Sequence, residues 1–230
     1  MATIPSALQA VKQRIDAAAR NAGRDPREAM LLAVSKTFPA AAVRTAWEAG
    51  QRAFGESYVQ EALDKIERSR DLLLEWHFIG PLQSNKTRLV AENFSWVHGI
   101  DRLKIAERLS AARPLSLPDL QVCLQVNISA EASKSGIAPP ALLPLARAVA
   151  LLPRLKLRGL MAIPEPTGDM ALQRQRFAQL RVLLEQLNSQ GFALDTLSMG
   201  MSDDLEAAVA EGATIVRVGS AIFGTRNTKP

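Results

Sequence analysis

The sequence has one cysteine and no long uninterrupted apolar segment among its 230 residues. A single thiol excludes an internal disulfide, and Cys123 in "LQVCLQVNI" is interpreted as a small buried hydrophobe rather than a nucleophile. No apolar run reaches the roughly 18 residues of a membrane-spanning helix. The opening "MATIPSALQAVKQR" also lacks the apolar core of a signal peptide. We therefore expect a cytoplasmic protein without a membrane segment.

Metal ligands and concentrated basic charge are scarce as well. The two histidines, His77 and His98, accompany no cluster of cysteines, so no zinc-like ligand set is present. The 28 basic residues exceed the 23 acidic ones by five, but they are scattered along the chain. Binding along a nucleic-acid backbone requires a concentrated basic patch, so we expect no nucleic-acid partner. A small phosphorylated anion is compatible with this charge.

Short apolar segments rich in β-branched residues alternate with segments of helical periodicity. With 47% hydrophobic and 22% charged residues, the chain can bury a large core. The alternation is typical of βαβ units and a parallel sheet. Eight segments are predicted to be strands: 30–37, 52–56, 75–80, 96–100, 120–128, 157–163, 196–202 and 214–223.

The segments between these strands show helical patterns. Before the first strand, Ile4, Leu8, Val11 and Ile15 fall on one stripe of an additional helix that ends near Gly23. The later segment "FAQLRVLLEQL" places its apolar residues on one face, and a glycine follows it as a stop signal. The remaining predicted helices are 40–49, 58–70, 84–92, 101–112, 140–152 and 203–211.

Eight strand–helix alternations in a chain of this length predict a TIM-type (β/α)8 barrel, which usually takes about 250 residues. We expect a single domain, residues 1–230, with an extra N-terminal helix. A doubly wound sheet is the alternative, but no "GxGxxG" follows the first strand to support a dinucleotide site. In a barrel, functional residues are expected at the C-terminal ends of the strands.

Lys36 in "LLAVSKTFP" lies at such a strand end, directly after an apolar run. Burial of an ammonium without a partner is costly. The lysine could be a surface charge, an ion-pair partner or an amine that reacts with a carbonyl compound. Its place at the end of the first strand fits a catalytic or cofactor-binding lysine.

The last two strands end in "SMGMSDD" and "VGSAIFG", where TIM barrels frequently bind phosphate. Ser202 is predicted to cap the following helix, and Gly219 and Ser220 offer a close backbone approach and a hydroxyl. Asp203 and Asp204 would repel a dianion, so we expect both to face solvent. Ordinary caps and turns are the alternative interpretation of these residues.

Arg217 lies inside the apolar run of the eighth strand and requires a partner or a ligand. One interpretation is an ion pair with an acid on a neighbouring strand, such as Glu56. The other is an arginine directed at the ring nitrogen of a cofactor. A lysine amine, a phosphate-binding loop pair and this arginine are the parts of a pyridoxal phosphate (PLP) site that uses a Schiff base.

Six segments resemble, in chain order, the motifs of the pyridoxal phosphate homeostasis protein family. That family is similar in fold to the barrel domain of alanine racemases, and the resemblance covers nearly the whole chain. The segments are "AVSKTFP", "FGESYVQEALDK", "WHFIGPLQSNKTR", "LQVNI…SKSG", "LRGLMAIP" and "LSMGMSDDLEAAVAEGATIVRVGSAIFG".

The resemblance implies roles for individual residues. Lys36 would form the internal aldimine with PLP, Arg217 would lie near the pyridine nitrogen, and Met199 would line the cofactor. Ser202, with Gly219 and Ser220, would bind the phosphate. An arginine at the ring nitrogen would leave the ring unprotonated and weaken it as an electron sink, which suits a carrier or a racemase better than a transaminase.

The sequence departs from the family pattern after the second strand. The usual Gly-Glu-Asn-Tyr-Val-Gln-Glu is here Gly-Glu-Ser-Tyr-Val-Gln-Glu, with Ser57 in place of asparagine. Serine keeps a hydroxyl but loses the second donor of the amide. Ser57 is therefore a candidate cofactor contact with fewer hydrogen-bond donors than the asparagine of the family pattern.

Three functions remain open from the sequence. The first is a protein that binds, buffers or delivers PLP without robust turnover. The second is a weak racemase, which needs an acid–base group on each face of the substrate. Tyr58, the single tyrosine, is predicted to pack at the barrel end with its hydroxyl hydrogen-bonded rather than to be that second base. The third is a cofactor-free Schiff-base aldolase that uses the same lysine and phosphate site.

Other residues and partners are expected to be secondary. Lys86 and Lys134 lie in loops on the same barrel face and are interpreted as solvated lysines. His77 is expected to be a buried histidine with its hydrogen bonds satisfied. His98 could reach the barrel end, but the sequence identifies no partner for it. We expect a monomer that passes PLP to PLP-dependent apo-enzymes.

Overall fold

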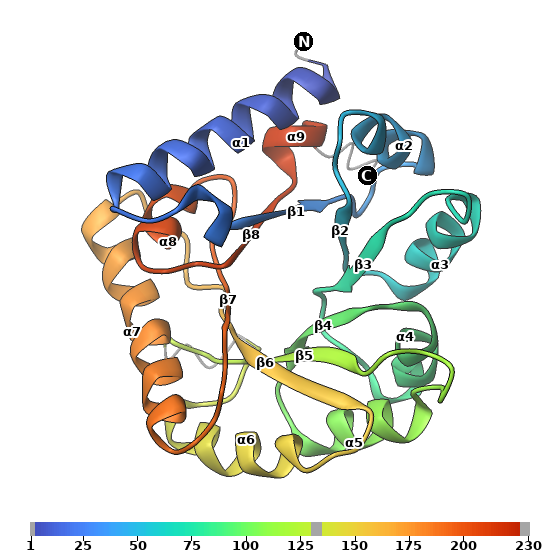
Figure 1. The fold of residues 1–230 in the computed structure, drawn as a ribbon, viewed down its shortest axis with the longest axis vertical. Coiled ribbons are helices and arrows are strands. Elements are labelled where there is room, and N and C mark those ends of the chain that lie inside the picture. The colour runs from blue at the N-terminus through green and yellow to red at the C-terminus, as the bar shows by residue number, and fades with distance from the viewer. Residues whose placement is uncertain (1–2, 130–134, 226–230) are drawn as a thin grey trace.

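The computed structural model describes residues 3–129 and 135–225. Eight parallel strands close into a barrel in chain order, from β1 next to β2 round to β8 next to β1. Helices surround this barrel (Figure 1). The predicted TIM-type (β/α)8 barrel is confirmed. The strands are β1 Met30–Val34, β2 Ala53–Glu56, β3 Glu75–Phe78, β4 Trp96–Ile100, β5 Leu120–Gln125, β6 Leu155–Met161, β7 Thr196–Ser198 and β8 Ile215–Val218.

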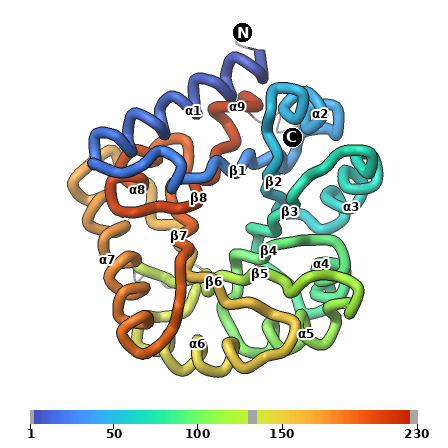
Figure 2. The backbone as a smooth tube through the Cα atoms, in the orientation of Figure 1, coloured from blue at the N-terminus to red at the C-terminus, as the bar shows by residue number. Residues whose placement is uncertain are grey.

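The helices follow the strands, and one precedes them. The predicted N-terminal helix is confirmed as α1, which packs against α8 and α9 beside the junction of β8 and β1 (Figures 1 and 2). The α-helices are α1 Ile4–Asn21, α2 Ala40–Glu48, α3 Val59–Arg68, α4 Thr87–Asn93, α5 Leu103–Ala112, α6 Leu142–Ala150, α7 Met170–Ser189, α8 Leu205–Ala210 and α9 Ser220–Phe223. Short 3-10 turns span η1 Pro26–Glu28, η2 Ser84–Lys86 and η3 Pro139–Ala141.

Two hydrophobic layers hold the barrel together. The outer layer lies between the strands and the helices and includes Phe54 and Phe177. The inner layer, inside the barrel, includes Leu32, Trp96 and Cys123. Cys123 is fully buried, and burial raises the pKa of its thiol to about 12. A thiol held in its neutral form is a poor nucleophile, so the interpretation of Cys123 as a buried hydrophobe is confirmed.

The predicted eighth strand, 214–223, is wrong in its second half. β8 ends at Val218, and α9 takes up residues 220–223. Gly219 sits at the change of direction, with φ −117° and ψ −72°. The apolar segment beyond Gly219 is still partly buried, since Ile222 in α9 is 3% exposed. A short apolar run is compatible with either a strand or a buried helix, so the sequence pattern could not place this boundary.

Five further strands, β1, β3, β5, β6 and β7, end earlier than predicted, and the ends of β1 and β7 concern the site. β1 stops at Val34, where a turn begins that is closed by a hydrogen bond of 3.0 Å from the Phe38 amide to the Ser35 carbonyl. Thr37 takes a left-handed conformation in this turn, with φ 71°. β7 stops at Ser198. Lys36 and Ser202 therefore lie in turns beyond their strands.

No helix in the described ranges 3–129 and 135–225 has the length and apolar character needed to cross a bilayer.

Candidate functional site

The turn that carries Lys36 is fixed on both sides by α3. The Thr37 amide donates to Glu61 Oε1 at 2.6 Å, and Lys65 Nζ donates to the Ser35 carbonyl at 2.7 Å. Lys36 itself is half-buried. These two contacts hold the left-handed Thr37, a conformation that is costly for a β-branched residue. The backbone of the candidate lysine is therefore set by side chains that do not belong to its own strand.

A buried ion pair lies behind this turn. Lys65 Nζ contacts Glu56 Oε1 at 2.7 Å and Glu61 Oε1 at 2.5 Å, and Ser35 Oγ donates to Glu56 Oε1 at 2.6 Å. Burial raises the pKa of Glu56, and the nearby Lys65 opposes that rise. The second carboxylate oxygen, Oε2, is buried without a hydrogen-bond partner among the described residues. Glu56 therefore pairs with Lys65, and the alternative interpretation of an ion pair between Arg217 and Glu56 is wrong.

Lys65 is a functional residue that the sequence interpretation missed. It is 2% exposed, although it lies in the charged helical segment "VQEALDKIER". One signal was available, because Glu61 stands four residues before it and Val59 and Ala62 mark the buried side of α3. That spacing indicates an intrahelical pair, but it does not indicate that the pair is buried against the end of β1.

The three predicted phosphate-binding residues lie together. Ser220 Oγ is 3.1 Å from Ser202 Oγ, although 18 positions separate them. A Cβ added to Gly219 would lie 3.1 Å from the Val34 carbonyl oxygen, so this backbone passes close to the end of β1. β8 also pairs with β1, with Val218 opposite Ala33. The hydroxyl pair and the Lys36 turn therefore occupy the same end of neighbouring strands.

Two predictions around Ser202 are wrong. α8 begins at Leu205, so Ser202 does not cap it, and the residue before the helix is Asp204. Asp204 does not face solvent, because its Oδ1 accepts the Met201 amide at 2.5 Å. Burial raises the pKa of Asp204, and this backbone hydrogen bond opposes the rise. Asp203 is exposed as expected. The Ser202 hydroxyl is thereby directed to Ser220 instead of a helix terminus.

Arg217 points into the barrel and is 3% exposed. Its Nη1 donates to Ser198 Oγ at 2.8 Å and its Nη2 donates to the Ala162 carbonyl at 2.9 Å. Both of these acceptors are neutral. Burial lowers the pKa of the guanidinium to about 10, while Asp204 counteracts this effect. Arg217 therefore stays cationic at neutral pH, which suits it to a ligand atom that accepts a hydrogen bond.

Two other predicted contacts have different surroundings. Ser57 is half-buried beyond β2, and a Cβ added to Gly80 would lie 2.5 Å from the Ser57 carbonyl oxygen. This close approach keeps Ser57 against the end of β3. Met199 is fully buried in the outer hydrophobic layer together with Val216. Side chains alternate along a strand, so Ser198 points into the barrel and Met199 points away from it.

The remaining candidates lie in different surroundings. Tyr58 is 54% exposed, so the prediction that it packs at the barrel end is wrong. Lys86 is half-buried in η2, and Lys134 lies outside the described residues. His77 is fully buried with both ring nitrogens hydrogen-bonded, which confirms it as a satisfied core histidine.

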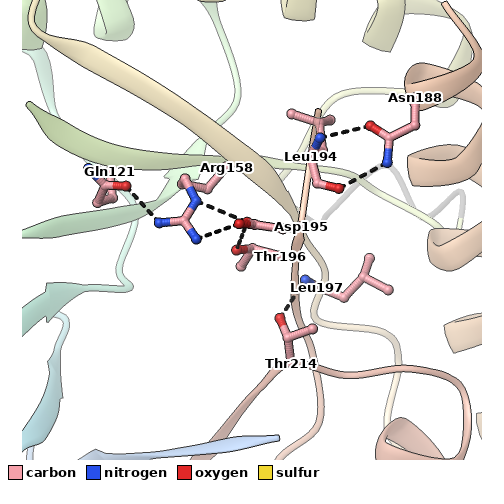
Figure 3. Close-up of polar contacts among 8 residues, drawn as sticks. All are labelled: Gln121, Arg158, Asn188, Leu194, Asp195, Thr196, Leu197 and Thr214. Carbon is pink, nitrogen blue, oxygen red and sulfur yellow. Dashed lines mark hydrogen bonds and ion pairs between the residues drawn. The ribbon is translucent and has the colours of Figure 1, made fainter. Parts of the chain in front are cut away.

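Polar side chains cover the opposite, N-terminal end of the barrel. Arg158 makes a two-point ion pair with Asp195, at 2.9 and 2.6 Å, and also donates to Gln121 at 2.8 Å (Figure 3). Its guanidinium lies 5.1 Å from the ring centre of Trp96, inside the barrel. The candidate site lies at the other end, where Lys36 and the Ser202–Ser220 pair follow the C-terminal ends of β1, β7 and β8.

Fold and site together define a TIM-type barrel of the alanine racemase class. The family model for the N-terminal domain of alanine racemase matches residues 6–227. The chain belongs to this family and, within it, to the pyridoxal phosphate homeostasis proteins. It is 63% identical over 227 residues to the pyridoxal phosphate homeostasis protein of Pseudomonas aeruginosa, covering 99% of this chain and 97% of the relative. It is 57% identical over 223 residues to that of Escherichia coli K12, covering 96% and 95%.

Solved structures agree with this assignment. PipY of Synechococcus elongatus with PLP bound has a TM-score of 0.85 and 39% identity, covering 96% of this chain and 100% of PipY. The alanine racemase of Corynebacterium glutamicum has a TM-score of 0.68 and 17% identity, covering 95% of this chain and 61% of the racemase. The second similarity concerns the fold alone.

Proposed function

We propose that this protein binds PLP through a Schiff base on Lys36 and serves to buffer or deliver the cofactor without robust turnover. The observation that supports this most is the placement of the Ser202–Ser220 hydroxyl pair at the same barrel end as the Lys36 turn. The names of the relatives and the PLP bound to PipY point the same way.

The residues present fit the parts of PLP. Ser202, Gly219 and Ser220 would hold the phosphate, because two hydroxyls meet there and a glycine lets the backbone come close. Lys36 would take the aldehyde carbon, and Arg217 would lie at the ring nitrogen. Ser57 is proposed to contact the cofactor or its water from the end of β2. Met199 supports the site from the hydrophobic layer behind β7.

PLP would supply an electrophilic carbonyl and a ring that can accept electrons. Arg217 remains cationic, so it would donate to the ring nitrogen, which would then carry no proton of its own. This weakens the ring as an electron acceptor. Racemisation needs an acid–base group on each face of the substrate, and we propose that Tyr58, which is 54% exposed, is not the second one. We therefore propose a carrier: one domain, 1–230, cytoplasmic and monomeric, with PLP-dependent apo-enzymes as recipients.

The absorbance of the purified protein tests this proposal. After incubation with PLP, the protein is expected to turn yellow, with a Schiff-base band that Lys36→Ala removes. Lys86→Ala, on the same barrel face, is the matched control and is expected to keep the band. A wild-type protein that stays colourless with PLP contradicts the proposal. The same result would favour the cofactor-free aldolase.

Exchange of the α-hydrogen of alanine in deuterated water separates the carrier from a weak racemase. The PLP-loaded protein is expected to exchange alanine far more slowly than a true alanine racemase under the same conditions. Turnover comparable with that of the racemase would contradict the carrier proposal while leaving PLP binding in place.

A further inference from the structure

A row of hydrogen bonds crosses the barrel interior from Arg217 to the start of β3. Arg217 donates to Ser198 Oγ at 2.8 Å, and Ser198 Oγ lies 2.7 Å from His98 Nδ1. His98 Nε2 lies 2.9 Å from His77 Nδ1, and His77 Nε2 lies 2.6 Å from Glu75 Oε1. Four strands contribute to this row: β8, β7, β4 and β3. We call these five residues the relay.

The two ends of the relay and the neutral state of its histidines set the direction of its bonds. A guanidinium only donates and a carboxylate only accepts, so Arg217 donates to the Ser198 oxygen and His77 Nε2 donates to Glu75. Burial disfavours a charged His77, so its Nδ1 carries no proton and accepts from His98 Nε2. Burial likewise keeps His98 neutral, so its Nδ1 accepts from the Ser198 hydroxyl. Both histidines are thereby neutral in the same tautomer.

Burial and stacking agree with this assignment. His77 and His98 are both 0% exposed. Burial lowers the pKa of each, and for His98 the neighbouring His77 and Arg217 lower it further. The His77 ring lies flat on Trp96, with 5.3 Å between ring centres and 5° between planes. At the far end, the hydrogen bond from His77 lowers the pKa of Glu75, against the opposing effect of burial.

Burying two histidines, a serine and an arginine inside the barrel costs more desolvation free energy than filling the same space with apolar side chains. A polar row that is satisfied at every described position specifies one arrangement of its members. Arg217 is the member of the relay that is proposed to contact the cofactor. Ser198 Oγ and the Ala162 carbonyl accept its hydrogen bonds and fix its side chain.

We propose that His98 and Ser198 are positioning residues that orient Arg217 toward the ring nitrogen of PLP, with His77 and Glu75 fixing the tautomer of His98. This inference rests on the proposed function, because it assumes that PLP is the ligand. The proposal predicts that PLP binding changes the chemical shifts of the His98 ring nitrogens, although His98 is not proposed to contact PLP.

Nitrogen-15 NMR of the histidine rings tests the relay directly, because the chain contains two histidines in all. In the PLP-free protein both rings are expected to show a protonated Nε2 and an unprotonated Nδ1. Addition of PLP is expected to shift the His98 nitrogens more than those of His77. A proton on Nδ1 of either ring overturns the bond directions. An unchanged His98 spectrum in protein that has turned yellow overturns the coupling.

Variants of Ser198 test the positioning role. Ser198→Ala removes the acceptor of Arg217 Nη1 and is expected to weaken PLP binding about tenfold, the order of one charge-assisted hydrogen bond. It is also expected to shift the ring-nitrogen resonance of 15N-labelled PLP, and Ser198→Thr, which keeps the hydroxyl, is expected to restore it. Cys123→Ala, inside the barrel but outside the relay, is the control. Wild-type affinity and an unshifted ring nitrogen in Ser198→Ala overturn the proposal.

Failure of the proposed function would look different. In that case the wild-type protein would form no yellow species with PLP, while the tautomers of the PLP-free protein would still be read from the histidine spectrum.

Discussion

Replacement of Lys65 by methionine is expected to lower the free energy of unfolding by about 3–5 kcal/mol, the usual cost of removing one partner from a buried ion pair. Glu56 is fully buried, and Lys65 is the cation that contacts its Oε1 at 2.7 Å. Methionine fills a similar volume, so the loss comes from the uncompensated carboxylate rather than from a cavity. Urea denaturation at neutral pH, followed by circular dichroism, measures the change.

Two variants control this prediction. Lys104→Met places the same substitution on an exposed lysine of α5 and is expected to change stability by less than about 0.5 kcal/mol. The double variant Glu56→Gln with Lys65→Met removes both charges and is expected to recover most of the loss. If the single Lys65→Met variant is as stable as the Lys104→Met variant, the buried pair does not stabilise the folded protein.

Substitution of Ser220 by aspartate is expected to weaken PLP binding about 100-fold. Ser220 Oγ lies 3.1 Å from Ser202 Oγ, where the phosphate is proposed to bind. A carboxylate at this position would face the phosphate dianion, and like charges that meet in a binding site cost several kcal/mol. A spectrophotometric titration with PLP measures the affinity, because the bound cofactor is coloured.

Pyridoxal, which lacks the phosphate, separates charge repulsion from general damage to the site. Ser220→Asp is expected to bind pyridoxal about as well as the wild-type protein does. Ser116→Asp adds the same charge at an exposed position before β5, at the other end of the barrel, and is expected to leave PLP affinity unchanged. Equal losses for PLP and pyridoxal in Ser220→Asp would place the phosphate elsewhere.

The eight strands and the helix before them could be predicted because each element has its own apolar pattern. Boundaries could not be predicted where an apolar run continues past a change of direction. The segment "TIVRVGSAIFG" is one such case, since β8 and α9 both bury its apolar residues. Ser202 is another, because a serine before a helix predicts a cap, whereas Asp204 turns back to the Met201 amide.

The chemistry of the site could be predicted by residue type, but the partners could not. Lys36 and Ser220 stand out because they follow apolar strands, and Arg217 stands out because it is a charge inside one. Their supports depend on closure of the barrel: His98 contacts Ser198 across 100 positions of the sequence, and Lys65 contacts the Ser35 carbonyl across 30. A single sequence gives no signal for contacts of that range.

Reductive trapping tests the central claim most directly. The protein is incubated with PLP, reduced with borohydride and digested, and the peptides are mapped by mass spectrometry. The account predicts one equivalent of label on the peptide that contains Lys36 and no label in Lys36→Ala. Label on Lys86, on Lys134 or at no defined lysine, with the Lys36 peptide unmodified, would contradict it.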